Sequence, residues 1–242
     1  MSAKAVRTRD LGIYLKESRY DEPKEVFKLL ASLARDCGVL REGSVVSDFG
    51  CAAGEFLHYL SREIPEARYF GYDVVPALLE KAREHTPKVV FSIGSVLDKT
   101  LLAPASTDIA FMSSVHSIFD EFEPCLANLL HWTRKGGRIF IFGVFNPYPV
   151  DVWVTFRTAD HPDPAHREAG WNMFSKASVS RYLEATLGVG KHTFIPFEMP
   201  FDLPPNSDDP VRSWTFLDGQ NRRLFTNGLS LICNLEILEI RP

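Results

Sequence analysis

Apolar and polar positions follow two different rhythms along the chain. In the early run EVFKLLASLARDCG, the apolar side chains fall at the spacing of one helical face, namely Val26, Leu30, Leu33 and Cys37. Gly38 follows this run, and glycine is a typical stop for a helix. The pattern therefore predicts a helix ahead of the first strand.

Short β-rich runs then alternate with helical runs. The predicted strands cover residues 44–50, 68–73, 89–94, 108–113 and 138–143. The helical runs between them are EFLHYLSREI, PALLEKAREH and residues 119–133, the last of which is ended by Gly136-Gly137. Such alternation is typical of βαβ units with a parallel sheet and right-handed crossovers. We therefore expect an α/β fold with a doubly wound, mostly parallel sheet.

Residues 146–174 break this alternation. They contain four prolines and two tryptophans, and a linker rarely carries such large aromatic side chains. We therefore expect an inserted cap. A further helix is predicted to begin at Ser178, with Gly188 as its stop, and the rest of the chain is strand-like. Two of these strand-like runs, RSWTFL and RRLFTN, flank Asp218-Gly219, a strong hairpin signal.

The length of 242 residues suits one domain with its own apolar core. We expect a single domain in four parts. These are an N-terminal helical segment (1–40), an α/β core (41–145), the cap insert (146–174) and a C-terminal part with a helix and strands (175–242).

The charge balance narrows the range of partners. There are 27 Lys and Arg against 31 Asp and Glu, a formal net charge of −4, whereas nucleic-acid backbones are bound by clustered Lys and Arg. No apolar run approaches the ~18 residues of a membrane span. The four cysteines are far apart and form no CxxC pair: Cys37, Cys51, Cys125 and Cys233. We therefore expect a cytoplasmic protein with reduced thiols and no nucleic-acid or membrane partner.

The most informative stretch is the turn after the first predicted strand, Asp48-Phe49-Gly50-Cys51-Ala52-Ala53-Gly54. Small residues there let a ligand approach the backbone, and the N-terminus of the following helix presents free N–H groups. Asp73 ends the second predicted strand, 25 positions after Asp48. An acidic side chain at that place can accept hydrogen bonds from both ribose hydroxyls of an adenosine.

Two cofactor classes use this layout. Dinucleotide-dependent enzymes carry G-x-G-x-x-G, but here Ala52 replaces the second glycine, and Phe56 and Leu57 stand where the third should be. A phenylalanine there would crowd the helix against a strand. An NAD(P)-dependent oxidoreductase is therefore the weaker alternative.

The stretch instead resembles the first motif of the class I S-adenosylmethionine-dependent methyltransferases, acidic-x-Gly-x-Gly-x-Gly, with Ala52 for the middle glycine. Gly71-Tyr72-Asp73 is similar to the second motif, whose acid binds ribose. Gly94-Ser95-Val96-Leu97-Asp98 is similar to the third, with serine for its usual aspartate. Residues 108–116 and 135–138 are similar to the family's fourth strand and to the turn before its fifth.

The resemblance covers residues 24–145, and the tail is similar to the family's helix followed by an antiparallel strand pair. It implies a Rossmann-like fold, residues 41–145 as the cofactor-binding core, and S-adenosyl-L-methionine as methyl donor in an in-line displacement. No metal is required, and the spacing of His161 and His166 is poor for metal ligands. The cofactor-binding residues that it implies are Asp48, Gly50, Cys51, Ala52, Gly54, Asp73, Val74, Ser95, Val96 and Ser113.

A general base is needed only if the methyl acceptor must lose a proton. His116 follows the fourth predicted strand, near the place that the resemblance implies for the sulfonium methyl group. His116 is therefore the candidate catalytic residue. The alternative is a histidine that caps a helix or packs in the core.

The acceptor pocket is expected between the cap and the N-terminal segment. Large side chains of the cap either form its apolar wall or pack the cap onto the sheet: Trp153, Phe156, Trp171, Met173 and Phe174. In the N-terminal segment, Tyr14 and Tyr20 either close over the cofactor, as N-terminal aromatic residues do in similar enzymes, or serve as surface anchors.

The sequence therefore predicts an enzyme that methylates a small-molecule acceptor, as a monomer or homodimer. Methylases of nucleic acids and glutamine in this family often carry Asn/Asp-Pro-Pro-Tyr after the fourth strand, where this chain reads Ser113-Ser114-Val115-His116. A chain that keeps the cofactor fold only for binding or regulation remains a second alternative.

Overall fold

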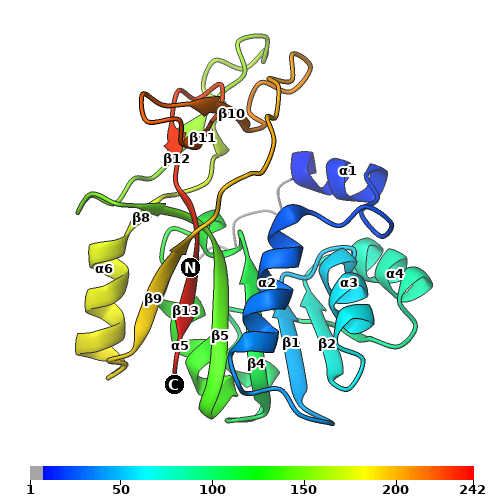
Figure 1. Cartoon of the computed structure of the whole chain (residues 1–242). Helices are drawn as coiled ribbons and strands as arrows, with labels where there is room; N and C mark the ends of the chain where they lie inside the picture. The colour runs from blue at the N-terminus through cyan, green and yellow to red at the C-terminus, as the bar shows by residue number, and fades with distance from the viewer. Residues whose placement is uncertain (1–7) are drawn as a thin grey trace.

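A central sheet lies between two layers of helices (Figure 1). The computed structural model describes residues 8–242, with side chains from residue 11 onward. One layer contains α2 (Glu25–Asp36), α3 (Glu55–Glu63) and α4 (Pro76–His85), and the other contains α5 (Glu123–Trp132) and α6 (Lys176–Arg181). This confirms the doubly wound α/β arrangement expected from the sequence.

Parallel strands form the centre of the sheet, whose order is β3-β2-β1-β4-β5-β13-β9. Their bounds are β1 (Val45–Phe49), β2 (Arg68–Asp73), β3 (Val90–Ile93), β4 (Thr107–Ser113), β5 (Thr133–Asn146), β9 (His192–Pro196) and β13 (Leu235–Ile240). The strands from β3 to β5 are parallel, whereas β13 runs antiparallel to both β5 and β9. The antiparallel pair that the resemblance implied is therefore present.

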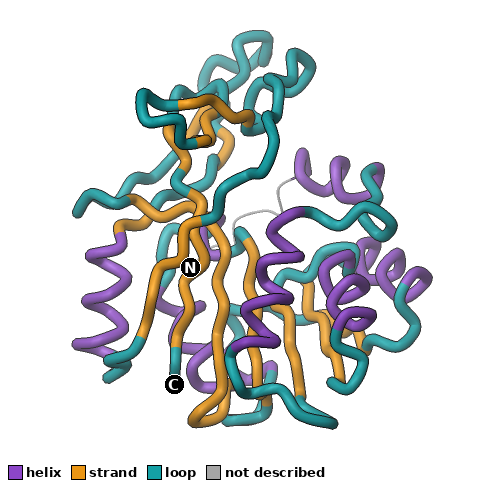
Figure 2. Tube along the Cα trace, in the orientation of Figure 1, coloured by secondary structure: helices purple, strands orange, loops and turns teal. Residues whose placement is uncertain are grey.

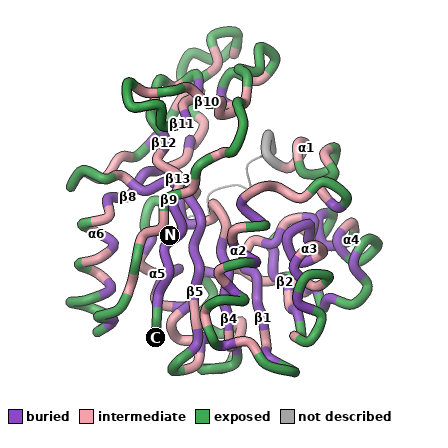
Figure 3. The backbone as a smooth tube through the Cα atoms, viewed as in Figure 1, coloured by how far each residue is buried: buried purple, intermediate pink, exposed green. Residues whose placement is uncertain are grey.

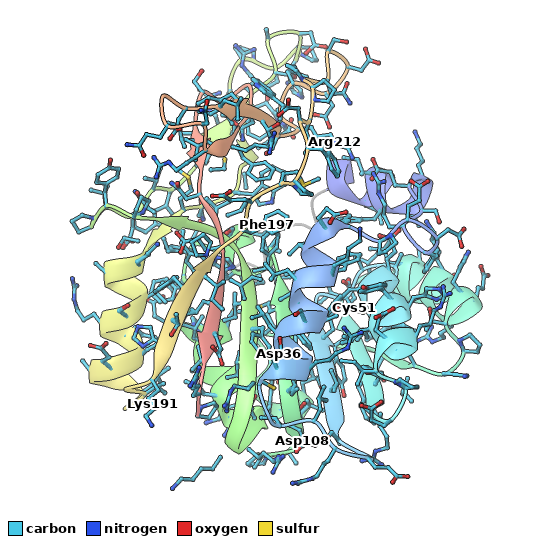
Figure 4. All side chains as sticks on the ribbon, viewed as in Figure 1. Asp36, Cys51, Asp108, Lys191, Phe197 and Arg212 are labelled. Atoms are coloured by element: carbon cyan, nitrogen blue, oxygen red, sulfur yellow. The ribbon has the colours of Figure 1, made fainter. Side chains whose placement is uncertain are left out.

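The carboxyl ends of the parallel strands meet at the upper edge of the sheet in Figure 1, where α1 (Thr8–Lys16) lies nearby. Asp108, near the start of β4, marks the opposite edge in Figure 4. Above the carboxyl edge the chain is mostly loop with short strands (Figure 2). These strands form one sheet of β10 (Trp214–Leu217), β11 (Arg223–Thr226) and β12 (Ile232–Cys233), and a pair of β6 (Thr155–Phe156) and β7 (Glu168–Ala169).

The central strands are buried on both faces, as parallel strands between helices should be, and Figure 3 shows them as mostly buried. On one face Phe49 stacks between Tyr72 and Trp132, with ring centroids 5.3 and 4.8 Å apart. On the other face Phe111 meets Phe56 edge-on at 4.9 Å. Burial of such large rings contributes much of the apolar area that stabilises the fold.

The fifth strand begins earlier than the sequence predicts. Helix α5 ends at Trp132, and β5 includes Gly136-Gly137 instead of leaving this pair as the end of a helix. A Cβ at Gly137 would lie 2.6 Å from the backbone oxygen of Asp108. Glycine is therefore needed where β5 passes the irregular start of β4.

The tail also differs in one detail. The last strand-like run of the sequence, SLICNLEILEI, is not one continuous strand but forms β12 and β13, because β12 pairs with β11 in the small sheet and β13 pairs with β5 in the main sheet. The hairpin predicted around Asp218-Gly219 is confirmed by the antiparallel pairing of β10 with β11. No described helix combines the length and apolar composition that crossing a membrane requires.

Helix α1 was not predicted by the polar pattern of its segment. With nine residues it is shorter than the ~12 at which isolated helices become even marginally stable. Lys81 of α4 supplies the stabilising contact, since its Nζ donates to the backbone oxygens of Tyr14, Leu15 and Glu17 at 3.0, 3.2 and 2.6 Å. A cation is favourable at the C-terminus of a helix. Tertiary contact, more than local propensity, accounts for α1.

Replacing Lys81 with methionine should loosen α1 while leaving the core intact. We expect amide hydrogen exchange in residues 11–17 to become about tenfold faster or more, because hydrogen bonds to a charged group contribute ~1.5–3 kcal/mol. Lys88→Met, which removes an exposed lysine just beyond the same helix, is the control. Equal protection in the two variants would show that α1 does not depend on Lys81.

Candidate active site

The turn after β1 has a backbone that favours small residues. Gly50, Ala52 and Gly54 have φ angles of 77°, 47° and 73°, in the left-handed region that glycine adopts without strain. The N–H groups of Gly50 and Cys51 donate to the backbone oxygen of Tyr72 at 2.7 and 3.0 Å. The turn is therefore tied to the end of β2, and Gly54, the N-cap residue of α3, has no side chain with which to cap that helix.

Asp73, at the end of β2, holds the same turn by its side chain. Oδ2 accepts a hydrogen bond from Ala52 N at 2.8 Å, and Oδ1 accepts one from Val75 N at 3.0 Å. Burial raises the pKa of Asp73, and these N–H donors oppose the rise. Since each carboxylate oxygen has more than one acceptor position, Asp73 can still bind hydroxyl groups of a ligand.

Asp48 lies on β1 and is 3% exposed. Its Oδ1 has no hydrogen-bond partner among the described residues. Burial, reinforced by the charge of Asp73, raises the pKa of Asp48 to about 8. The carboxyl group is therefore mostly protonated at pH 7. An unpartnered polar atom in a buried place costs free energy and suits a site that receives a polar ligand.

The end of β4 reaches the turn from the other side. The side chain of Val115 fills the space over Gly50, where any Cβ would overlap it. Ser113 ends β4, and its Oγ is a second buried polar atom without a partner among the described residues. Val74, just beyond β2, is 48% exposed. These predicted cofactor contacts therefore share the carboxyl edge with the turn.

The loop after β3 joins this edge as well. Gly94 N donates to the backbone oxygen of Asp73 at 3.0 Å, which brings Ser95 beside the end of β2. Ser95 Oγ accepts a hydrogen bond from Leu97 N at 3.2 Å, so it shapes its own turn. Val96 is buried and its backbone oxygen accepts from Asn128 Nδ2 at 2.8 Å.

His116 is 1% exposed and lies in a 3-10 turn (His116–Ile118) after β4. Its ring stacks on Phe145 at 4.9 Å and covers Gly143, where a Cβ would overlap the imidazole. Nε2 lies 3.3 Å from Ser117 Oγ, and Nδ1 has no partner within the described part of the chain. Burial lowers the pKa of His116 to about 4, so the ring is neutral at pH 7.

The N-terminal segment lies directly against the turn. The hydroxyl of Tyr20 donates to the backbone oxygen of Ala53 at 2.6 Å, and its ring stacks on His85 at 4.1 Å. Arg19 N donates to Glu55 Oε1 at 2.8 Å. The sequence left the role of Tyr20 open, and the structure places it on the turn backbone. Sequence reasoning missed Glu55, because an acid in the first turn of a helix is ordinary.

The large cap side chains that were expected either to line a pocket or to pack onto the sheet have different environments in the structure. Phe174 is buried against Phe122 at 4.9 Å, and Met173 is also buried, so both pack the cap onto the sheet. Trp153 is 57% exposed, and its Nε1 donates to the backbone oxygen of Asp120 at 3.0 Å. Periodicity alone does not separate side chains that pack a core from side chains that line a pocket.

A cavity of about 140 Å³ separates the N-terminal segment from the cap. Its lining comes from α1, the start of α2, the cap and the segment before β10: Ile13, Tyr14, Glu17, Lys24, Trp171, Asp209 and Arg212. Arg212, labelled in Figure 4 between the small upper sheet and α1, pairs with Glu17 at 2.6 Å. The cavity lies between the cap and the N-terminal segment, where the sequence leads us to expect the acceptor pocket, and Arg212 was not among the residues expected there.

The groups at the carboxyl edge fit an adenosyl-sulfur cofactor. Asp73 offers acceptors for ribose hydroxyls, and the uncapped start of α3 offers N–H donors for a carboxylate. Asp48 Oδ1 and Ser113 Oγ are polar atoms that still lack a partner within the described residues. The carboxylates of Asp73 and Glu55 also make this edge acidic, which suits a sulfonium or ammonium group.

Comparison with known proteins agrees with this reading. Residues 47–139 match the family model of the methyltransferase domain. A malonyl-[acyl-carrier protein] O-methyltransferase of Hahella chejuensis is 34% identical over 118 residues, which are 48% of this chain and 40% of that protein. An arsenite methyltransferase of Halobacterium salinarum is 27% identical over 136 residues, which are 50% of this chain and 34% of that protein. The chain thus spans less than half the length of these curated relatives.

The solved structures give the same fold. The YcgJ protein of Bacillus subtilis superposes with a TM-score of 0.56 over 89% of this chain and 97% of its own, at 14% identity. At that identity the likeness concerns the fold alone. Together with the family match, it confirms the resemblance to class I methyltransferases that the motifs indicated.

Asp48→Asn should change how stability depends on pH. The folded chain holds the Asp48 proton up to about pH 8, whereas an unperturbed aspartate loses it near 3.8. Between these values the folded state binds more protons, so Asp48 makes the free energy of unfolding fall as pH rises, by up to ~1.4 kcal/mol per pH unit. Asparagine does not titrate, so the variant should gain stability relative to wild type from pH 5 to pH 8.

Urea unfolding at pH 5, 6, 7 and 8 measures this difference, with the exposed Asp36→Asn as the control for loss of a carboxylate. A gap between wild type and Asp48→Asn that stays constant over this range would contradict a protonated Asp48.

Proposed function

We propose that this chain, whose residues 47–139 match the family model of the methyltransferase domain, is a class I S-adenosylmethionine-dependent methyltransferase that methylates a small-molecule acceptor. The observation that carries the proposal is the bond from Ala52 N to the Asp73 carboxylate, with unpartnered Asp48 and Ser113 atoms at the same edge. When bound, S-adenosyl-L-methionine supplies a sulfonium-activated methyl group for in-line displacement by the acceptor.

The chain's own residues bind and orient the cofactor in this proposal. Asp73 accepts hydrogen bonds from the ribose, and the apolar side chains of Val74 and Val96 flank the adenine. The small residues of the turn let the cofactor approach the backbone N–H groups at the start of α3. The full set of cofactor contacts is Asp48, Gly50, Cys51, Ala52, Gly54, Asp73, Val74, Ser95, Val96 and Ser113.

His116 is the proposed catalytic residue. Its pKa of about 4 leaves the imidazole neutral over the whole neutral range, so it needs no deprotonation before it accepts a hydrogen bond. The same low pKa makes it a weak general base, because base catalysis is most efficient with a pKa near the working pH. We therefore assign His116 the task of orienting the acceptor through Nδ1, with proton acceptance as a minor contribution.

A small molecule is the proposed acceptor. The cavity beside the N-terminal segment has a volume of about 140 Å³, which suits a compact ligand. The two curated relatives act on different acceptors by name, a malonyl group on a carrier protein and arsenite. The family match therefore does not carry an acceptor over to this chain, and the residues that line the cavity determine which ligands fit it.

The domain organisation, oligomeric state, compartment and partners of the protein are proposed from its sequence. We propose one domain that works as a monomer or homodimer in the cytoplasm, without a nucleic-acid or membrane partner. The net charge of −4 and the scattered cysteines support this proposal.

Calorimetric titration with S-adenosylmethionine and S-adenosylhomocysteine tests the proposal, with NAD and NADP as controls. We expect micromolar binding of the two adenosyl-sulfur ligands alone. Binding of a nicotinamide cofactor would instead favour the oxidoreductase alternative. Tight adenosyl-sulfur binding, no turnover on a broad acceptor panel and a stable complex with a second protein would favour the binding or regulatory alternative.

Asp73→Ala should weaken the binding of S-adenosylhomocysteine by roughly 1.5–3 kcal/mol, the scale of hydrogen bonds to a charged group. Because Asp73 also holds the turn, Asp73→Asn is needed as a second variant that keeps an acceptor oxygen for Ala52 N. Asp36→Ala, at an exposed position at the end of α2, is the control. Calorimetry reports the affinities, and unchanged affinity in folded Asp73→Ala would remove Asp73 from the ribose role.

Because a misoriented acceptor reacts more slowly, His116→Ala should lower kcat about 100-fold on an acceptor found by screening, and should leave S-adenosylhomocysteine affinity unchanged. The rate of the wild type should show no titration near pH 6.5 from this residue, because the pKa of His116 is about 4. Steady-state kinetics from pH 5.5 to 8 measure both. Unchanged turnover in the variant would make His116 a packing residue only.

A further inference from the structure

The cavity between the N-terminal segment and the cap adjoins the proposed cofactor edge on two sides. Lys24 lines the cavity and interacts electrostatically with Glu55, the first residue of α3 after the turn. Trp171 lines it from the cap, and the next residue, Asn172, donates its N–H to the backbone oxygen of Ser117 at 2.7 Å, just past β4. The cavity therefore lies where an acceptor would meet the carboxyl edge.

Lys24 is in an unfavourable place for a lysine. It is the N-cap residue of α2, a position that favours Ser, Thr, Asp or Asn, and its side chain makes no cap. Its cation lies at the positive end of the helix dipole. It is partly buried, and burial lowers the pKa of its amine. Each of these conditions disfavours a charged amine in the ligand-free chain.

The contacts of Lys24 do not offset this cost. Its Nζ lies 5.7 Å from the ring centre of Tyr14 and 5.6 Å from that of Phe27. Among side chains of the described residues, no carboxylate forms an ion pair with Lys24. Aromatic faces attract a cation by only ~0.5–2 kcal/mol.

Two of the acids near Lys24, Glu17 and Glu55, already contact arginine residues. Glu17 pairs with Arg212 at 2.6 Å and lies 3.7 Å from Arg19. Glu55 accepts the backbone N–H of Arg19 at 2.8 Å. Lys24 therefore interacts with Glu55 and Glu17 only at longer range, and among the described residues it forms no ion pair with a carboxylate.

Building on the proposed function, we infer that Lys24 binds the carboxylate of the methyl acceptor, and that the acceptor is a small organic acid with an apolar body. A carboxylate at this place would pair with the amine and face the N-terminus of α2, where the dipole favours an anion. Ile13, Tyr14 and Trp171 offer apolar surface to the rest of the ligand. In this complex the charged amine of Lys24 has an anionic partner, so the cost of placing a cation at the start of α2 is offset.

The test uses benzoate, benzamide and benzylamine, which share one ring and differ in charge. Each is titrated by NMR into the full chain, with and without saturating S-adenosylhomocysteine. We expect benzoate to bind at least about tenfold more tightly than benzamide, and Lys24→Met to lower benzoate affinity about tenfold or more. Lys24→Arg should keep most of the affinity. Lys28→Met, which removes an exposed lysine paired with Glu25 on the same helix, should have no effect.

A second measurement uses no ligand. Lys24→Met keeps the aliphatic stem and removes the charge, so it should raise the melting temperature of the free chain by about 2–4 °C. Preference for benzylamine, equal binding of benzoate and benzamide, undiminished benzoate affinity in Lys24→Met, or a lower melting temperature in this variant would each overturn the inference.

The two proposals fail separately in this design. Absence of S-adenosylhomocysteine binding in the wild type would count against the cofactor, while benzoate binding that depends on Lys24 would still establish the anion site. Normal S-adenosylhomocysteine binding without benzoate selectivity would leave the methyltransferase proposal intact and remove the acid acceptor.

Discussion

The carboxylate of Asp73 joins the parts of the site. One oxygen holds Ala52 in the turn after β1, and the other holds Val75 ahead of α4. The Asp73 backbone oxygen receives Gly94 N from the loop after β3. Three loops from different βα units are thus fixed by one residue. The positive φ of Ala52, unusual for a residue with a side chain, is held in place by this contact.

Unpartnered polar atoms lie along the same edge. Asp48 Oδ1, Ser113 Oγ and His116 Nδ1 all lack partners among the described residues, although buried polar groups normally find one. Beneath them the core is a stack of aromatic rings around Phe49 and Phe111. Packed aromatic rings therefore support an edge at which several buried polar atoms have no hydrogen-bond partner among the described residues. This is expected of a site that gives up some stability in order to bind a ligand.

Sequence reasoning succeeded where the determining contacts are local. The order of β1, the turn, α3 and β2 could be predicted because each element is determined by consecutive residues. Asp73 could be singled out as a candidate because it stands at the end of a predicted strand. It failed where partners are distant in sequence. Helix α1 depends on a contact with Lys81 of α4. The role proposed for Lys24 depends on the pairing of its neighbour Glu17 with Arg212, which is distant in sequence. In the cap, Trp171 and Phe174 are both large and apolar, and only the packed structure separates the cavity side chain from the core side chain.

The strand order has a consequence for synthesis of the chain. In the sheet, β9 pairs with β13 and lies outside it, yet β9 precedes β13 in sequence by about 40 positions. While the ribosome is still making the residues between them, β9 has no neighbour to pair with, and the outer edge of β5 is uncovered where β13 will later bind. An exposed strand edge invites association between chains. The nascent protein therefore passes through a period in which chaperone protection would matter most.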